Sequence, residues 1–194
     1  NWTVHHPLHP ERKVIKGIDL HVRKGEVVGI AGLMGAGRTE FAMSVFGRTW
    51  GTNISGEILL HGKPADTSTV GKAVAGGLAY ATEDRKVYGL NLIDHIKHNV
   101  TIANLPGVAR SGVIDDMAEL KIANEYRRKT NIRSSSVYQI TGSLSGGNQQ
   151  KVVLSKWLFA DPQVLILDEP TRGIDVGARY EIYTIINKLA DEGR

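Results

Sequence analysis

A glycine-rich segment near the start of the chain restricts its fold more than any other feature. Gly32–Thr39 (GLMGAGRT) follows a short apolar run at 26–31 and precedes a helical pattern over 39–46. Glycines let backbone N–H groups approach an anion without a Cβ in the way, and the N-terminus of the next helix adds partial positive charge. The pattern predicts a buried strand, a phosphate-binding loop and a helix. An ordinary glycine-rich turn between a strand and a helix remains the alternative.

The end of this loop departs from the usual phosphate-loop pattern at one position. Arg38 stands where the pattern has lysine, and Thr39 follows it. An arginine keeps the positive charge, but its planar fork is bulkier than an ammonium group and cannot replace it one for one between phosphates. We expect nucleotide binding to survive while catalytic geometry suffers. Thr39 is placed to put its hydroxyl on Mg²⁺.

A second feature is an apolar run that ends in two carboxylates. Residues 164–167 (VLIL) lead directly into Asp168 and Glu169. Asp168 can hold Mg²⁺, directly or through water, and Glu169 can polarise the water that attacks a γ-phosphate. The alternative is a strand that ends at the surface with solvated acids before Pro170. A phosphate loop in the same chain favours the functional interpretation.

The remaining pattern alternates strands with helices and predicts an α/β fold with a parallel sheet. Strands are expected over 14–22, 57–60 and 77–82, and a helical insertion over about 85–142. Helical stripes include Ile93, Ile96 and Val100, and a final helix covers 182–189. The length of 194 residues suits one domain.

Composition excludes several classes of function. The chain has no cysteine, which excludes a disulfide scaffold, a cysteine-ligated zinc site and a cysteine nucleophile. Its 24 Lys and Arg against 20 Asp and Glu give a net charge of only +4, and the basic residues are scattered. We therefore expect no nucleic-acid partner.

A third segment, Leu144–Lys151 (LSGGNQQK), predicts another anion-binding helix start. A serine N-cap before an ordinary helix would explain Ser145 but not the whole octet. The octet closely resembles the LSGGQ signature of the nucleotide-binding domains of ATP-binding cassette (ABC) transporters. Together with GLMGAGRTE (32–40), ATEDRK (81–86) and DEPTRGIDVGA (168–178), it resembles the C-terminal cassette of bacterial monosaccharide importer ATPases of the ribose, xylose and galactose type.

This resemblance implies an α/β fold of the P-loop NTPase class. An ABC-type cassette has a mostly parallel core sheet, an N-terminal antiparallel β subdomain and a helical subdomain. The whole chain, residues 1–194, would form one nucleotide-binding domain, truncated at its C-terminus, with the helical subdomain at about 85–142. We expect the chain to begin just past a linker between two cassettes and to stop before the switch histidine of the family.

The resemblance also assigns roles to individual residues. Glu169 would be the catalytic base, Glu83 would occupy the Q-loop position and Asp175 the D-loop. Mg²⁺ would be held by Thr39, Asp168 and Glu83. ATP would contact Gly32, Gly35, Ala36, Gly37, Arg38, Thr39 and His9, and the ATP of a partner cassette would contact Leu144, Ser145, Gly146, Gly147 and Asn148.

The adenine-stacking position remains open between three side chains. His9 lies nearest the position where the family stacks an aromatic residue on adenine, although Trp2 or His6 would also serve. The cluster of His5, His6 and His9 includes two neighbouring prolines, so we expect an exposed loop there and not a metal site.

The implied function is that of an ATP-binding and ATP-hydrolysing subunit that energises sugar uptake. With Arg38 and Glu83 substituted, this domain's own site would be degenerate, while its signature caps the ATP of the partner. The implied partners are an N-terminal cassette of the same polypeptide, transmembrane permease subunits and, indirectly, a periplasmic sugar-binding protein. The permease would dock a short helix between Glu83 and about residue 100, placing the protein peripherally on the cytoplasmic face of the bacterial inner membrane. A regulatory nucleotide-binding module without turnover is the alternative.

Overall fold

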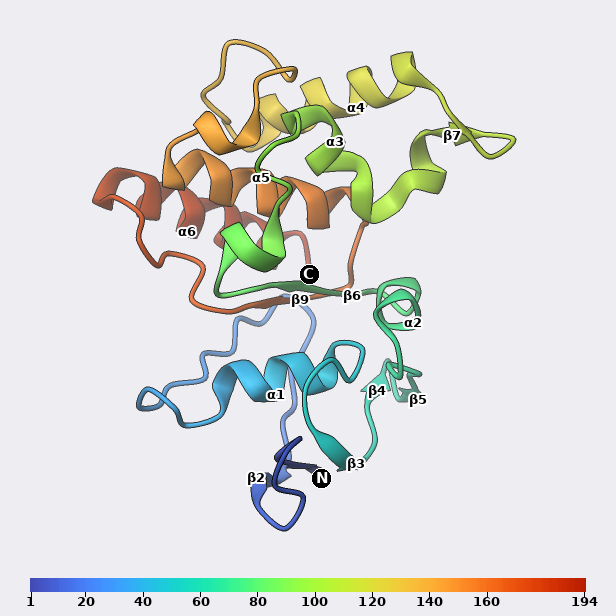
Figure 1. The fold of residues 1–194 in the computed structure, drawn as a ribbon, viewed down its shortest axis with the longest axis vertical. Coiled ribbons are helices and arrows are strands. Elements are labelled where there is room, and N and C mark those ends of the chain that lie inside the picture. The colour runs from blue at the N-terminus through green and yellow to red at the C-terminus, as the bar shows by residue number, and fades with distance from the viewer. The chain divides into compact units, whose positions relative to one another are not determined.

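A computed structural model describes residues 1–194 and shows a mixed α/β fold (Figure 1). The strands are β1 (Trp2–His5), β2 (Lys13–Ile18), β3 (Thr52–Ser55), β4 (Leu59–Leu60), β5 (Lys63–Pro64), β6 (Leu78–Ala81), β7 (Ala109–Arg110), β8 (Val113–Ile114) and β9 (Val164–Leu167). The α-helices are α1 (Arg38–Val45), α2 (Val70–Ala75), α3 (Ile96–Thr101), α4 (Asp116–Lys129), α5 (Gly146–Phe159) and α6 (Val176–Asp191). Short helical turns of other types cover Arg85–Gly89, Ile102–Val108 and Thr141–Ser143.

The chain divides into two compact units, which are described separately. The first unit comprises residues 1–80, 162–168 and 190–194, and the second comprises residues 81–161 and 169–189. The helices α3, α4 and α5 belong to the second unit, whereas α1 and the N-terminal strands belong to the first.

The N-terminal strands form the antiparallel sheet that the resemblance implies. Its strand order is β2-β1-β3, and both pairings are antiparallel. Trp2, Val4 and Ile15 are buried between this sheet and α1, which contributes Phe41 and Val45. The indole Nε1 of Trp2 donates a hydrogen bond of 2.9 Å to Ser44 Oγ on α1.

The central strands β6 and β9 pair with each other, and β6 is buried along its whole length. The buried strand predicted over 26–31 is wrong, because this segment lies outside the strands of the structure. Val27 and Ile30 are 62% and 51% exposed. An apolar run becomes a strand only where a neighbour satisfies its backbone N–H and C=O groups, and no strand pairs with it here.

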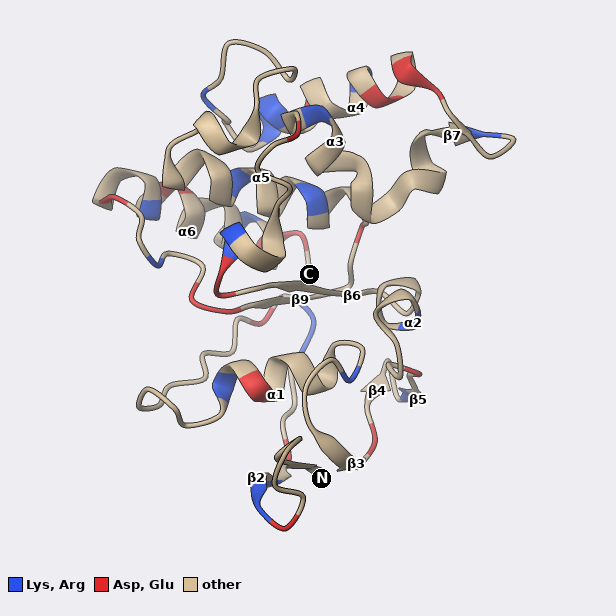
Figure 2. Ribbon diagram, viewed as in Figure 1, with Lys and Arg blue, Asp and Glu red and all other residues tan.

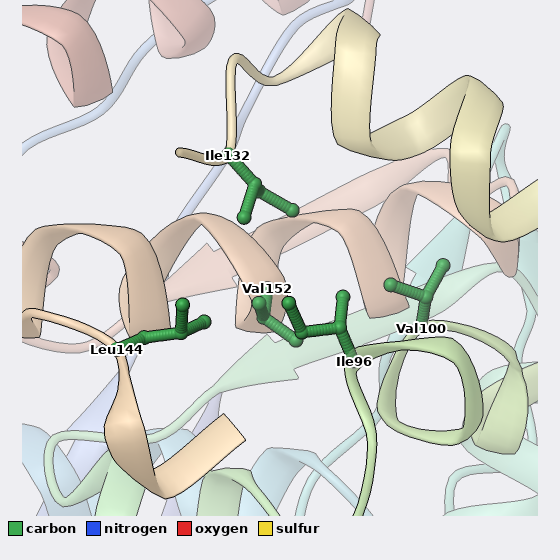
Figure 3. Close-up of a cluster of buried hydrophobic side chains, with 5 residues drawn as sticks. All are labelled: Ile96, Val100, Ile132, Leu144 and Val152. Carbon is green, nitrogen blue, oxygen red and sulfur yellow. The ribbon is translucent and has the colours of Figure 1, made fainter. Parts of the chain in front are cut away.

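The second unit is a helical bundle built around α5. Figure 3 shows Ile96, Val100, Ile132, Leu144 and Val152 meeting in one cluster of buried side chains. Helix α5 is buried at every position from Gln149 to Leu158, so it has no solvent-facing side. The predicted stripe on α3 is right for Ile96 and Val100, but Ile93 precedes the helix and is 86% exposed.

Helix α4 shows how charge supports the bundle. The Asp115 side chain caps its N-terminus. Acidic residues occupy its first turn and basic residues its last turn (Figure 2). This distribution complements the helix dipole. From α3, the buried Lys97 Nζ lies 2.9 Å from Glu119 Oε2. Burial alone would lower the pKa of Lys97, but hydrogen bonds from its ammonium group to Asp116 and Glu119 raise it.

None of the helices combines the length and the apolar character needed to cross a membrane.

Candidate functional site

The glycine-rich loop ends at an uncapped helix. Gly35 and Gly37 have φ values of 79° and 92°, in the left-handed region that favours glycine. Gly37 is the residue before α1, and no side chain caps this helix N-terminus. Within the loop, the N–H of Ala36 donates to the carbonyl oxygen of Leu33 at 3.1 Å. The loop therefore runs into a helix N-terminus that no side chain caps, and such an N-terminus favours a bound anion.

The first turn of α1 carries the two residues that follow the glycines. Arg38 and Thr39 are both half-buried, and the helix begins at Arg38, within one residue of the predicted start. An uncapped N-terminus, a guanidinium group and a hydroxyl suit a phosphate and its magnesium ion. The residues present therefore fit a magnesium nucleotide.

Asp168 lies at the end of β9 and is buried, with 9% of its surface exposed. Its Oδ2 accepts a hydrogen bond of 3.0 Å from the hydroxyl of Tyr80 on β6. Burial, followed by the neighbouring Asp168 carboxylate, raises the pKa of Tyr80 well above its usual range. The hydroxyl thus stays protonated and acts as the donor. No sequence motif marks Tyr80, whose position in the apolar run at 77–82 is its only signal in the sequence.

Glu169 adopts an uncommon backbone conformation. Its φ is 46°, and its carbonyl oxygen accepts a hydrogen bond of 3.0 Å from the N–H of Arg172. A residue other than glycine in this region costs on the order of 1 kcal/mol or more, and such strain concentrates at functional sites. The turn after β9 therefore holds the backbone of Glu169, the predicted catalytic base, in a conformation that an unconstrained chain would avoid.

Four residues of the octet line one side of a small cavity in the second unit. Ser145 precedes α5 without capping it, and its Oγ accepts a hydrogen bond of 3.0 Å from Asn148 Nδ2. The Oδ1 of Asn148 accepts a hydrogen bond of 2.8 Å from the N–H of Arg133. The cavity has a volume of about 120 Å³ and is lined by Arg133, Ser145, Gly147, Asn148, Lys151, Asp175, Gly177, Ala178 and Glu181. The structure thus brings the signature together with the predicted D-loop residue Asp175.

Both glycines of the octet lie where the chain approaches itself closely. A Cβ on Gly147 would overlap the methyl group of Ala178 on α6. A Cβ on Gly146 would lie 2.8 Å from Arg85 Nη2 and 3.1 Å from the carbonyl oxygen of Gly173. Packing therefore requires glycine at position 147, whereas at position 146 the flexible Arg85 side chain could move aside.

Glu83, the residue predicted to occupy the Q-loop position, takes part in an ion pair. Its partner is Arg172, whose carbonyl oxygen accepts a hydrogen bond of 3.0 Å from Arg85 Nη1. Arg85 in turn approaches Gly146, so segments near 83, 172 and 146 meet in the second unit. No local sequence pattern predicts this pairing. The role of Glu83 as a metal ligand stays a prediction.

The structure narrows the choice of an adenine-stacking residue. Trp2 is buried in the core of the first unit and bonded to Ser44, which excludes it. His9 is exposed, lies 5.2 Å from the ring of His6 and has its Nδ1 3.5 Å from Glu11. The assignment of His9 stays a prediction.

Comparison with known proteins agrees with this geometry. Residues 15–172 match the family model described as ABC transporter. The chain is 58% identical over 194 residues to an L-arabinose transport ATP-binding protein of Geobacillus stearothermophilus. It is 47% identical over 193 residues to a xylose import ATP-binding protein of Thermoanaerobacter pseudethanolicus. Both alignments cover 100% of this chain and 38% of the relative. A ribose import ATP-binding protein of Bacillus cereus is 45% identical over 92% of this chain and 36% of its own length.

Solved structures share the fold at low sequence identity. The ATP-binding cassette MJ0796, in a dimeric post-hydrolysis state with ADP and Pi, matches with a TM-score of 0.77 and 18% identity, over 100% of this chain and 84% of that one. The ADP conformation of the cassette MJ1267 matches with a TM-score of 0.74 and 17% identity, over 99% and 77%. The fold is that of an ATP-binding cassette, and with the family match over residues 15–172 the chain belongs to the ABC transporter family.

Proposed function

We propose that this chain binds ATP with Mg²⁺ and hydrolyses it as a nucleotide-binding domain of a monosaccharide importer. The observation that carries the proposal is the uncapped N-terminus of α1, reached through the left-handed Gly35 and Gly37 and followed at once by Thr39. Backbone N–H groups and the helix dipole at this point favour a polyphosphate.

Each residue has a distinct part in this proposal. The loop N–H groups and Arg38 hold the phosphates, and the Thr39 hydroxyl and the Asp168 carboxylate hold the metal. Magnesium, when bound, neutralises charge on the β- and γ-phosphates. Glu169 orients the attacking water and accepts its proton.

We further propose that the domain's own site hydrolyses ATP poorly and that its signature acts on a partner's nucleotide. Arg38 replaces the compact ammonium of the usual loop, and Glu83 is engaged by Arg172. The cavity at Ser145 is lined by Arg133 and Lys151 and equally by Glu181 and Asp175, so this part of the proposal is supported by the signature sequence at 144–151 and not by a net charge of the cavity.

The transport role rests on relatives that are longer than this chain, which spans 38% of the length of the first two described above. Their names specify arabinose and xylose, and that of a third specifies ribose, so we propose a monosaccharide as cargo. The proposed partners are an N-terminal cassette on the same polypeptide, permease subunits and, indirectly, a periplasmic sugar-binding protein. The proposed location is peripheral, on the cytoplasmic face of the inner membrane.

Titration calorimetry with ATP, with and without Mg²⁺, tests the binding proposal. Wild-type protein should bind magnesium ATP, and Thr39→Val should weaken that binding by about 10-fold while leaving metal-free ATP binding unchanged. The matched control is Thr184→Val on α6, whose hydroxyl donates to the carbonyl oxygen of Tyr180 at 2.9 Å. Absence of ATP binding by the wild type would overturn the proposal. Binding without turnover in the assembled transporter would favour the regulatory module instead.

A further inference from the structure

We propose that Tyr80 is a positioning residue that holds one oxygen of Asp168 and thereby favours Mg²⁺ over Ca²⁺ at the nucleotide site. The inference rests on the proposed function, because it assigns Asp168 to the metal. No motif points to Tyr80. Its role follows from the hydrogen bond and the packing that surround it.

The contact between Tyr80 and Asp168 is short and shielded from water. The hydroxyl lies 3.0 Å from Oδ2, and the two residues are 4% and 9% exposed. They lie on β6 and immediately after β9, which are neighbours in the sheet. Within a low-dielectric environment, a hydrogen bond to a charged oxygen is stronger than one in water. The hydroxyl therefore restricts rotation of the Asp168 carboxylate.

The ring of Tyr80 is itself anchored to the phosphate-loop helix. It packs against Phe46, the residue that directly follows α1, with ring centroids 5.7 Å apart. One side chain thus contacts both the acid after β9 and the helix that begins at the glycine-rich loop. A shift of α1 would be transmitted to Asp168 through a stiff aromatic ring.

The chemical consequence is a choice between two modes of metal binding. With Oδ2 engaged by a hydroxyl, Asp168 offers Oδ1 as its metal ligand and acts through one oxygen. Mg²⁺ requires near-octahedral geometry and takes carboxylates through one oxygen, whereas Ca²⁺ accepts two oxygens of one carboxylate and more ligands. A carboxylate fixed by Tyr80 therefore suits Mg²⁺ and disfavours Ca²⁺.

The test measures how ATP binding depends on the concentration of each metal. In Tyr80→Phe, the ring and its contact with Phe46 remain and only the hydroxyl is lost. The Mg²⁺ concentration that gives half-maximal enhancement of ATP binding should rise by about 10-fold. The corresponding Ca²⁺ concentration should change by a smaller factor. Affinity for metal-free ATP should not change. The matched control is Tyr126→Phe, which removes a hydroxyl that donates to the carbonyl oxygen of Leu158 at 3.1 Å.

A second variant keeps the test decisive if Tyr80→Phe does not fold. Phe46→Leu retains the hydroxyl but weakens the support of the ring, and it should shift the Mg²⁺ concentration in the same direction by a smaller factor. An unchanged ratio of Mg²⁺ to Ca²⁺ requirement in folded Tyr80→Phe, or in Phe46→Leu if the first variant is unfolded, would overturn the inference. Wild-type protein that fails to bind ATP at any metal concentration would overturn the proposed function, and the inference with it.

Discussion

Lys151, buried near the start of α5, forms an ion pair with Glu181 on α6. The Lys151 side chain is 2% exposed, and its ammonium group also donates to the carbonyl oxygen of Asn131 at 2.8 Å. Arg133 reaches the same carboxylate, with Nη2 lying 2.9 Å from Glu181 Oε1. Helix α6, which follows the predicted D-loop residue Asp175, is thereby joined to α5, which contains most of the LSGGNQQK octet.

Removing the Glu181 side chain should destabilise the fold more than removing the charge of Lys151. Glu181→Ala leaves a buried ammonium group without its counter-charge and should lower the free energy of unfolding by about 3 kcal/mol. Lys151→Met replaces the cation with an apolar chain of similar size and should cost less. Urea unfolding of both variants checks this order, with Glu125→Ala on the exposed side of α4 as the control.

This pair also predicts a dependence on acid. Hydrogen bonding from Lys151 lowers the pKa of Glu181 below its usual value. The stabilisation is present above the unfolded-state pKa and is lost as the pH falls through the folded-state value. The stability difference between wild type and Glu181→Ala should therefore shrink below about pH 4.5. An equal difference at pH 7 and at pH 3 would contradict the assignment.

The packing of the octet against α6 predicts a rescue. Gly147→Ala places a methyl group against that of Ala178 and should cost about 1–3 kcal/mol through overpacking. Ala178→Gly removes the opposing methyl, so the double variant Gly147→Ala/Ala178→Gly should regain part of the loss. Thermal unfolding in the absence of nucleotide measures both effects. A double variant no more stable than Gly147→Ala would show that Ala178 is not the obstacle.

Lys156 should destabilise the fold at neutral pH. Burial lowers the pKa of Lys156 to about 8 from 10.5, and its ammonium donates to the carbonyl oxygen of Gly89 at 2.6 Å. Below pH 8 the buried ammonium is charged, and its burial lowers the free energy of unfolding by the full amount. Between pH 8 and pH 10.5 Lys156 is mostly neutral in the folded chain but still protonated in the unfolded chain. Stability therefore rises with pH across that window.

Lys156→Met should be more stable than wild type by about 1–2 kcal/mol at pH 7, after the lost contact with Gly89 is counted. Chemical unfolding at pH 7 and at pH 10 should show this advantage shrinking toward zero. Lys188→Met, at an exposed position of α6, should show no such trend. A constant advantage across the window would refute the titration of Lys156.

Glu169→Gln tests the catalytic base in the assembled transporter. The amide keeps the shape of the side chain but cannot accept a proton, so hydrolysis at this domain's own site should fall by roughly 10²–10⁴-fold. Phosphate release under single-turnover conditions measures it, with Glu125→Gln as the control. Unchanged turnover would place hydrolysis in another cassette.

Arg38→Lys tests whether the site is degenerate. A lysine restores the compact cation between the phosphates, so turnover should stay unchanged or rise. ATP affinity should be kept, since both side chains carry the positive charge. A large loss of turnover on restoring lysine would contradict the degenerate-site proposal.

Local sequence patterns predicted the local structure well. The glycines at 35 and 37 and the helix that follows them, the run at 164–167 and the final helix were all visible from period and turn chemistry, because neighbours in sequence determine them. The apolar run at 26–31 shows the limit, since strand formation depends on a partner strand that the run itself does not specify.

Contacts between distant segments were not predictable from one sequence. Tyr80 and Asp168 lie 88 residues apart. Glu83 was interpreted through its motif position, which says nothing of a pairing with Arg172. The burial of Lys151 on α5 likewise depends on distant partners, because its ammonium group donates to the carbonyl oxygen of Asn131 and pairs with Glu181.

The close approach of Gly147 to Ala178 bears on how substitution scans of such motifs are interpreted. A residue larger than glycine at position 147 would clash with α6 and destabilise the fold even when no nucleotide is present. Mutational intolerance at this position therefore measures interhelical distance as well as ligand recognition. Glycine at position 178 would distinguish the packing effect from an effect on ligand recognition, because it restores the space between the helices while the octet keeps its substitution.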